Sequence, residues 1–366
     1  MARNRWFRYP AGFSAGALDA AFSAIELDKR KRVVDPFAGA ATAGTAIVSR
    51  GVAFRGLEAH PLIAELAQLK FVRPGDPANL VRLGRQIARS ADAEDMEEEA
   101  ELVRRSFSRD VLATLIGLRD AIKAEDSDWA LYLKWALLGV LREVASVRAG
   151  WPYQMPTQSR RPIAKDPRQR FLLRVQRMAD DLGSAASSVA ADGRVGCGDA
   201  RISRSWSDLL AGETIDACVS SPPYLNNFDY ADATRLELYF WRVVASWQEM
   251  TREVRDGLIV GATQQTSKGG AVTARTWLSR FPDFSATLDQ IREDLRYQRR
   301  QRPRGKEYDN LVVMYFADVG KVLVNLFAQL DPGAPAAFVI GDSAPYGVYI
   351  DTPELIRRLS HSVGFD

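Results

Sequence analysis

The chain has 366 residues, of which 46% are hydrophobic and 26% are charged, and its formal net charge is +3. This composition is typical of a folded globular protein and excludes a disordered or fibrous chain, and so weak a net charge by itself indicates no polyanionic partner. Two cysteines, Cys197 and Cys218, are too few for a disulfide framework and fit a reducing compartment. No apolar run reaches the length of a membrane span and no signal-peptide pattern is present, so we expect a cytoplasmic protein without a membrane partner.

The first elements are predicted to form a strand, a turn and a helix. Residues 14–28 have the pattern of a helix capped by Ser14, and Val33 to Asp35 form the first strand. A turn of small residues follows, in which Gly39 permits close approach of the backbone. A helix then continues through residues 46–48, and its start offers free N–H groups.

A second strand, residues 52–57, ends at Glu58. This carboxylate lies about 23 positions after Asp35, the spacing at which a βαβ unit places an acidic side chain for ribose hydroxyls. The strand–turn–helix–strand pattern therefore predicts a cofactor site at this edge of a sheet. An ordinary turn without a ligand is the alternative.

The middle of the chain, residues 74–193, is helical in pattern. Residues 111–122 and 129–147 are strongly amphipathic, and the acidic run 92–101 is expected to be a solvated helix face. An aromatic and proline-rich loop, residues 151–156, is followed by the basic residues Arg160, Arg161 and Lys165. This interleaving suits either a nucleic-acid surface or an ordinary linker beside a helical bundle.

A rigid corner, Ser220-Ser221-Pro222-Pro223-Tyr224, follows a short apolar strand at residues 215–219. Two successive prolines fix the backbone and remove two N–H donors, and ligands of open α/β sheets collect at the carboxyl ends of strands. Ser221 offers a hydroxyl acceptor, Pro222 a free carbonyl and Tyr224 a flat ring. This set suits a planar group with an exocyclic amine, whereas the alternative is a proline-rich turn with a packed tyrosine.

The remaining elements complete an α/β pattern. A helix is expected over residues 233–247, and Asn227, Asp229 and Tyr230 either border a pocket or cap that helix. Later elements are helices at residues 308–330 and 352–360 and a buried strand at residues 336–340. The stretch 251–306 is the rival to the middle region for target recognition. Its cluster Arg296–Lys306 holds the densest positive charge of the chain, and phosphate contact is its expected use if DNA is the substrate.

Two of these segments resemble the motifs of one enzyme family. Asp35-Pro36-Phe37-Ala38-Gly39 resembles the cofactor motif of S-adenosylmethionine-dependent amino-methyltransferases, and Ser221-Pro222-Pro223-Tyr224 resembles their catalytic motif. These enzymes methylate exocyclic amines of cytosine or adenine in DNA. Arg8–Phe13 is similar to the element that precedes the cofactor motif. The resemblance covers residues 5–70 and 190–345 and implies a doubly wound, mostly parallel, Rossmann-like α/β sheet with a helical insertion.

The resemblance also implies roles for single residues. Asp35 and the backbone around Phe37 would hold the methionine end of the cofactor, Glu58 its ribose hydroxyls, and Asp199 its adenine amine. The cofactor-binding residues it implies are Phe13, Asp35, Pro36, Phe37, Gly39, Thr42, Glu58 and Asp199. One departure is Ala41, which replaces the second glycine of the loop and is expected to tighten the turn and weaken cofactor binding. No Cys/His spacing predicts a metal site.

The catalytic residues implied by the resemblance are Ser221, Pro222, Pro223 and Tyr224. Ser221 and the Pro222 carbonyl would hold the amine protons, and Tyr224 would stack on a base flipped out of the duplex. Serine at the first position favours cytosine N4, because adenine enzymes more often carry Asp or Asn there. The alternatives are an adenine-N6 enzyme, an RNA base amino-methyltransferase, and a catalytically silent module that binds cofactor or nucleic acid.

We therefore predict three parts: a cofactor half at residues 1–73, a helical insertion at 74–193 with a target-recognition role, and a catalytic half at 194–366. S-adenosylmethionine is the expected cofactor and double-stranded DNA the expected partner, with a restriction enzyme as a further candidate partner. The two C-terminal edge strands of the family fold are missing from the predicted elements. The chain is accordingly expected to be a fragment, one part of a split enzyme with a complementing C-terminal chain, or a variant with an exposed sheet edge.

Overall fold

The computed structural model describes residues 2–9, 12–93, 95–148, 155–159, 165–184 and 192–366. Pro10 and Ala11 of the element before the cofactor motif lie outside these described residues. So do Arg160, Arg161 and most of the aromatic loop at residues 151–156, so the suggestion that this loop meets nucleic acid stays a prediction.

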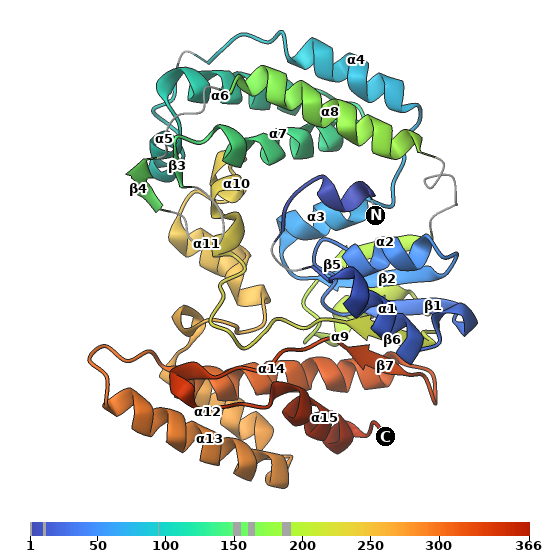
Figure 1. Cartoon of the computed structure of the whole chain (residues 1–366), viewed down its shortest axis with the longest axis vertical. Coiled ribbons are helices and arrows are strands. Elements are labelled where there is room, and N and C mark those ends of the chain that lie inside the picture. The colour runs from blue at the N-terminus through green and yellow to red at the C-terminus, as the bar shows by residue number, and fades with distance from the viewer. Residues whose placement is uncertain (1, 10–11, 94, 149–154, 160–164, 185–191) are drawn as a thin grey trace.

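A five-stranded parallel sheet forms the centre of the fold, in the order β5-β2-β1-β6-β7 (Figure 1). Its strands are β1 Arg32–Asp35, β2 Ala53–Glu58, β5 Gly193–Cys197, β6 Ala217–Ser220 and β7 Ala336–Phe338. Val34 is in register with Arg55 on one side and with Cys218 on the other. Along the chain, β2 is added on one side of β1 and β5 outside β2. The chain then crosses back, and β6 and β7 are added on the other side of β1. This reversal confirms the predicted doubly wound α/β fold.

Helices cover both faces of the sheet because the strands are apolar on both sides. Val33 and Phe54 belong to a buried cluster with α1 Ala15–Ala24, α2 Thr42–Val48 and part of α3 Pro61–Leu69. Their neighbours Val34 and Leu57 point to the opposite face and pack in a second cluster. That cluster includes residues of α9 Ser203–Leu210, α12 Lys268–Leu278, α13 Pro282–Arg300, α14 Tyr308–Gln329 and α15 Thr352–Val363.

A helical block formed by the insertion lies beyond α3 (Figure 1). Its elements are α4 Pro77–Ile87, α5 Glu101–Ser106, α6 Arg109–Lys123, α7 Ala130–Val144, α8 Pro167–Gly183 and the antiparallel pair β3 Val147–Arg148 and β4 Met155–Ser159. Its core is continuous with residues outside the insertion: Trp6 and Phe7, the outer side of α3, and residues of α10 Arg235–Phe240 and α11 Trp247–Glu253. Short 3-10 helices complete the described elements: Ala2–Arg5, Leu27–Lys29, Asp232–Thr234, Arg255–Gly257, Thr263–Gln265 and Pro345–Gly347.

The acidic run at residues 92–101 is not the helix face that its composition predicted. Most of it precedes α5, which begins at Glu101, and Glu99 is buried. Glu99 forms ion pairs with Arg119 of α6, 2.9 Å away, and with Arg242 after α10, 2.7 Å away. A buried guanidinium needs a carboxylate partner, and this requirement overrides the preference of acidic side chains for water.

Several predicted helices differ in length from those in the structure. The helix expected over residues 129–147 ends at Val144, and Val147 belongs to β3, while the helix expected over residues 352–360 continues to Val363. The helix expected over residues 233–247 is interrupted after Phe240, because Arg242 adopts a left-handed φ of 58° and Ser246 caps a new helix, α11. The first helix ends at Ala24 rather than residue 28, and Glu26 is also left-handed, with φ 51°. Nothing in the side-chain periodicity marks either reversal.

Contrary to the sequence expectation, α14 is long and apolar enough to cross a membrane by length and composition. However, 67% of its apolar window is buried inside the protein, and it packs against α12, α13 and α15. This burial is the behaviour of a core helix. In the described part of the chain β7 is an edge strand of the sheet, and the hairpin that the family fold places beside it is not among the described strands.

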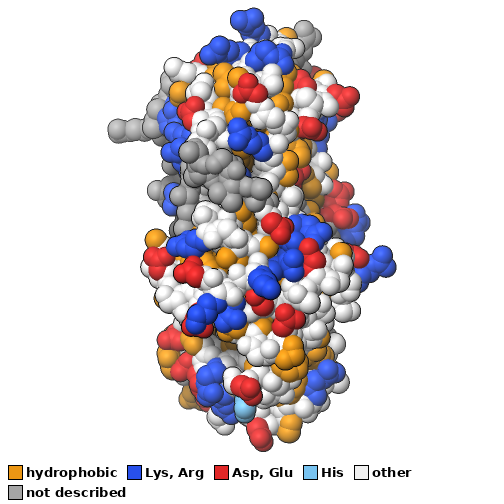
Figure 2. All heavy atoms as spheres, turned by 90° about the vertical axis from the view of Figure 1, so that its right-hand side faces the viewer, with side chains coloured by type: hydrophobic (Ala, Val, Ile, Leu, Met, Phe, Trp, Pro, Cys, Tyr) orange, Lys and Arg blue, Asp and Glu red, His pale blue; other side chains and the backbone are white. Residues whose placement is uncertain are grey.

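The face from which the strands start is shown in Figure 2, which views the right-hand side of Figure 1. Lys and Arg side chains are interspersed there with Asp and Glu, and neither sign forms a continuous field. Mixed charge of this kind keeps a surface soluble but does not attract a polyanion.

Candidate active site

Two adjoining cavities lie where β1, β2, β5 and β6 end. We call the first the Glu58 cavity; it is lined by Tyr9, Pro36, Phe37, Gly39, Leu57, Glu58, Ala59, Gly198, Asp199, Ala200, Ser221, Pro223, Tyr230, Gly257, Leu258 and Ile259. We call the second the Tyr224 cavity; it is lined by Gly12, Phe13, Phe37, Ala38, Gly39, Thr42, Ser221, Pro222, Tyr224, Asn226, Phe228 and Tyr230. The two cavities share Phe37, Gly39, Ser221 and Tyr230. Of the predicted site residues, Asp35 alone lines neither cavity, because it is buried behind the turn.

The turn after β1 is held by the carboxylate of Asp35. Its Oδ1 accepts hydrogen bonds from the Phe37 amide at 2.9 Å and from the Ser220 hydroxyl at 2.5 Å. Burial raises the pKa of Asp35 to about 7. Gly39 and Ala41 both adopt left-handed conformations, with φ of 50° and 54°. Ala41 therefore occupies a backbone conformation that favours glycine, the residue that the resemblance implies at this position.

Glu58 joins the end of β2 to the turn after β1. Its Oε2 accepts from the Gly39 amide and its Oε1 from the His60 amide, both at 2.8 Å. Burial raises the pKa of Glu58 to about 7, and the charge of Asp35 acts in the same direction. Each carboxylate oxygen has a further acceptor position, so Glu58 can still accept hydrogen bonds from a ligand in its cavity.

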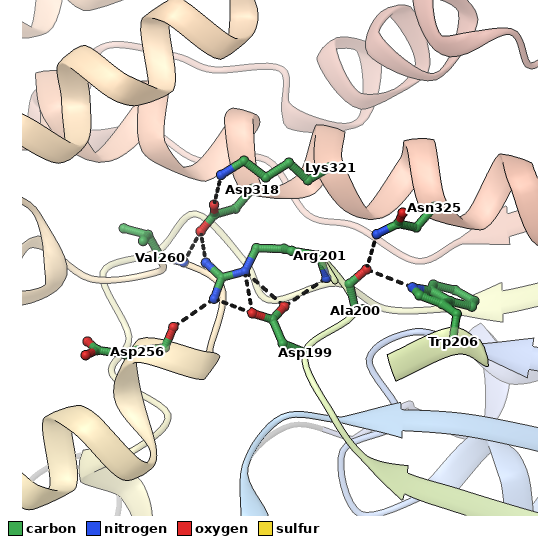
Figure 3. A network of polar contacts seen from close by, with 9 residues as sticks. All are labelled: Asp199, Ala200, Arg201, Trp206, Asp256, Val260, Asp318, Lys321 and Asn325. Carbon is green, nitrogen blue, oxygen red and sulfur yellow. Dashed lines mark hydrogen bonds and ion pairs between the residues drawn. The ribbon is translucent and has the colours of Figure 1, made fainter. Parts of the chain in front are cut away.

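Asp199, after β5, is held by an arginine two residues later (Figure 3). The Arg201 guanidinium donates to both oxygens of Asp199 at 2.8–3.0 Å and to Asp318 of α14 at 2.7 Å. It also donates to the carbonyl of Asp256 at 2.8 Å, and Asp256 precedes Gly257, Leu258 and Ile259 in the cavity wall. The network thus connects the end of β5, α14 and the 257–259 segment around the Glu58 cavity.

Two successive serines at the end of β6 point in opposite directions, because side chains alternate along a strand. Ser220 is fully buried and donates to Asp35, whereas Ser221 is only half-buried and lines both cavities. Tyr224 lines the second cavity, and Phe228 and Tyr230 stand edge to face in the same wall with ring centroids 4.7 Å apart. A hydroxyl, a free carbonyl and aromatic rings therefore surround one opening.

Asn227, Asp229 and Tyr230, in the loop after the corner, were expected either to border a pocket or to cap the following helix, and the structure gives each a different place. Tyr230 lines both cavities. Asp229 accepts from the Ala231 amide at 3.0 Å and forms an ion pair with Arg255 at 2.9 Å, so it caps the following turn. Asn227 accepts from the backbone amide of Thr263 at 2.8 Å and braces the loop from outside.

Sequence reasoning missed several polar residues of the site. Ser220 stands beside the predicted Ser221, and only strand alternation distinguishes the two. Arg201 and Asp318 are 117 positions apart, so no local pattern connects them. Lys70 is buried, its pKa is lowered to about 7 by burial, and its ammonium donates to the carbonyl of Ala40 in the turn after β1.

Comparison with known proteins identifies relatives along nearly the whole chain. No protein-family model matches it. Two type II methyltransferases named M.AvaI, from Nostoc sp. and Anabaena variabilis, are 21% identical to it over 404 aligned residues, which cover 99% of this chain and 79% of each relative. The type II methyltransferase M.BsoBI of Geobacillus stearothermophilus is 26% identical over 163 residues, or 42% of this chain and 31% of that protein.

Among solved structures, the rRNA methyltransferase aviRa of Streptomyces viridochromogenes matches 59% of this chain and 62% of its own, with 14% identity and a TM-score of 0.26. The relatives that match 99% of this chain, and the parallel sheet, agree with what the two motifs predict. The chain is therefore a relative of the type II methyltransferases, and its predicted resemblance to the S-adenosylmethionine-dependent DNA amino-methyltransferases is confirmed.

Proposed function

We propose that the protein is a site-specific DNA methyltransferase that moves the methyl group of S-adenosylmethionine to an exocyclic base amine, with N4 of cytosine as the favoured target. The observation that carries the proposal is the shared wall of the two cavities, in which Ser221 and Phe37 face both. A cofactor in one cavity and a base in the other would be in contact at that wall. Methyl transfer needs such contact, because the reacting atoms must meet in line.

The residues around the Glu58 cavity fit the proposed cofactor. S-adenosylmethionine carries an ammonium group, two ribose hydroxyls and an adenine amine, all of which donate hydrogen bonds. Glu58 and Asp199 supply carboxylate acceptors in the cavity wall, Phe37 supplies an apolar ring, and Asp35 holds the Phe37 amide from behind the turn. The bound cofactor would supply an electrophilic methyl group on a positively charged sulfur. Of the residues proposed to hold it, Pro36, Phe37, Gly39, Glu58 and Asp199 line this cavity. Phe13 and Thr42 would reach it from the adjoining Tyr224 cavity, and Asp35 would act from behind the turn.

The Tyr224 cavity supplies what a poor amine nucleophile requires. The lone pair of a cytosine amine is delocalised into the ring, so the amine reacts only when its hydrogens are held out of the plane. Ser221 Oγ and the Pro222 carbonyl are the acceptors we assign to those hydrogens, and the Tyr224 ring is the stacking surface for the flipped base. Pro223 fixes the corner between them. The nitrogen would gain the methyl group as the methyl–sulfur bond breaks, which leaves S-adenosylhomocysteine as the neutral thioether, and the nitrogen would then lose one of the held protons to solvent.

The test is transfer of labelled methyl from S-adenosylmethionine to duplex DNA and to RNA, with product nucleosides identified by mass spectrometry. Ser221→Ala and Tyr224→Ala are compared with Ser207→Ala, a control at an exposed serine of α9. We expect N4-methylcytosine in DNA from the wild type and the control, and at least a ten-fold loss in the two site variants.

The other outcomes separate the alternatives. N6-methyladenine in DNA would keep the enzyme and correct the base. Label in RNA alone would replace DNA by RNA as the substrate. Binding of the cofactor without transfer to either polymer would overturn the proposal in favour of a silent module. A partner restriction enzyme, a complementing chain and the three-part division of the chain stay predictions.

A further inference from the structure

The turn between α13 and α14 carries the densest positive charge of the chain, and we propose that it contacts the phosphates of duplex DNA beside the Tyr224 cavity. We define the α13–α14 surface by three exposed side chains, Arg300, Arg304 and Lys306. The inference rests on the proposed function and names the surface through which that function holds its substrate.

The direction of α14 places this surface at the carboxyl ends of the strands. The C-terminal end of α14 is joined to β7 by a short turn, and the Asp331 amide of that turn donates to the carbonyl of Ile215, just before β6, at 2.9 Å. The N-terminal end of α14, with the turn before it, therefore lies at the opposite end of the sheet. Figure 1 shows the turn between α13 and α14 on the side toward which the strands run.

Hydrogen bonds connect the surface to the loop after the corner. Thr266 donates to Glu307, the residue next to Lys306, at 3.5 Å. Three residues earlier, the Thr263 amide donates to Asn227 at 2.8 Å. Asn227 lies between two residues that line the Tyr224 cavity, Asn226 and Phe228.

A second connection runs through the loop after β7. Gly341 lies against the Tyr224 ring, since a Cβ at this glycine would be 3.8 Å from it. Further along the same loop, the Tyr346 ring packs on Tyr308 with centroids 4.8 Å apart, and its hydroxyl contacts the backbone of Lys306. The charged turn is therefore fixed to the cavity rim from two sides.

Arg300, Arg304 and Lys306 have no carboxylate partners among the described residues, whereas the inner arginines do. Arg302, between them, is held by Gln298 and by the ring of Tyr346. Glu307 and Asp309 lie beside the turn, and Arg299 pairs with both, at 3.6 and 2.9 Å. Arg296 is 3.7 Å from Asp309 as well. Because the inner arginines neutralise the nearby carboxylates, the positive charge of Arg300, Arg304 and Lys306 is available to an external anion.

Three other exposed arginines form the rival surface, at α4 and just after its end. Arg82 and Arg85 of α4 and Arg89, two residues beyond the helix, line a groove between α4 and α8. Among the described residues none of the three forms an ion pair, although Asp180 lies in the groove wall. This groove lies on the outside of the helical block, with α7 and α3 between it and the sheet (Figure 1). A duplex lying there could not place a base in the Tyr224 cavity.

The experiment compares two triple variants that each remove three positive charges. One is Arg300→Gln, Arg304→Asn and Lys306→Gln, with Asn chosen because residue 304 has a left-handed φ of 59°. The other is Arg82→Gln, Arg85→Gln and Arg89→Gln. Binding of a labelled 30-base-pair duplex is followed by fluorescence anisotropy between about 50 and 300 mM NaCl, with S-adenosylhomocysteine present. Thermal unfolding and S-adenosylhomocysteine affinity serve as folding controls.

We expect the α13–α14 variant to flatten the slope of log affinity against log salt by about 2.7, since each phosphate contact contributes about 0.9 on B-DNA. The α4 variant should keep the wild-type slope. If the α4 variant flattens the slope, or if neither does while the wild type methylates duplex DNA, the surface assignment is overturned and the proposed function stands. If the wild type neither binds nor methylates duplex DNA, both fall.

Discussion

Asp35 shows how a single buried carboxyl connects stability to pH. Its ordinary pKa is 3.8, and burial in the turn after β1 raises it to about 7. Between these values the folded protein holds a proton that the unfolded chain has released. The stabilisation from this group is complete below pH 4 and is lost as the pH rises through 7.

We predict that this loss is visible as a difference between the wild type and Asp35→Asn. His60 and Lys70 have pKa values lowered by burial to about 3 and about 7, so they change stability in the opposite direction. The pKa of Glu58 is raised to about 7 and in part by the charge of Asp35, so the difference between the two proteins reports Asp35 together with its effect on Glu58. The free energy of unfolding of the wild type should fall relative to the variant by up to about 1.4 kcal/mol per pH unit between pH 5 and 7. Urea denaturation at pH 5, 6, 7 and 8 measures this, and parallel pH profiles would contradict it.

Ser220 is the second residue on which the turn depends. Replacing it with alanine leaves the buried Asp35 carboxyl with one hydrogen bond fewer, so Ser220→Ala should lower the free energy of unfolding at pH 7 by about 1–3 kcal/mol. Ser207→Ala, at an exposed serine of α9, is the matched control and should change it by less than about 0.5 kcal/mol. If both changes lowered the free energy of unfolding by the same amount, the hydrogen bond from Ser220 to Asp35 would make no specific contribution to stability.

The residues of the two motifs could be assigned to one site from the sequence because each follows directly on a short apolar strand. The carboxyl ends of parallel strands lie at the same edge of a sheet, so recognising the strands is enough to predict that Asp35, Glu58 and Ser221 lie close together. That Ser220 binds Asp35 while Ser221 lines the cavities could not be predicted without knowing which side of β6 faces the core. The Arg201–Asp318 pair required the path of α14, which no local pattern contains.

At the scale of elements, α2 lies close to the sheet because it carries Gly44 over the ring of Phe54. A Cβ at Gly44 would come within 2.4 Å of that ring. We predict that Gly44→Ala lowers the free energy of unfolding by about 1–3 kcal/mol, because a packed ring cannot move away without disturbing β2.

The control is Gly16→Ala, a helical glycine of α1 with nothing within 4 Å of the added Cβ. There the change should raise stability by about 0.5–1 kcal/mol, as alanine is the better helix former. Chemical denaturation measures the free energy of unfolding of both variants. If Gly44→Ala raised it, α2 would be able to move away from the Phe54 ring, and the prediction would be wrong.

Element boundaries were harder to predict than element types. The strands and the long helices follow hydrophobic periodicity, which the sequence displays directly. The break between α10 and α11 depends on Arg242, whose side chain reaches Glu99 in the insertion. A contact across 143 positions therefore fixes where a helix ends, and such a contact is invisible to periodicity.

At the scale of the whole molecule, the insertion does not have a core of its own. Trp6, Phe7 and residues of α3 and α10 belong to the same buried cluster as α6, α7 and α8. We predict that the isolated segment 74–193 lacks a cooperative unfolding transition, because it would expose the apolar surface that these outside residues cover. Circular dichroism during heating measures this, and a sharp transition in the isolated segment would contradict it.

The shared core has a consequence for how the protein is made. Synthesis proceeds from the N-terminus at about 5–20 residues per second, so residues 231–258 emerge on the order of 10–40 s after α3 is complete. During that interval part of the apolar surface of α3 and α7 has no native partner. Nascent chains of intermediate length should therefore be the form of this protein that chaperones bind and that aggregates first.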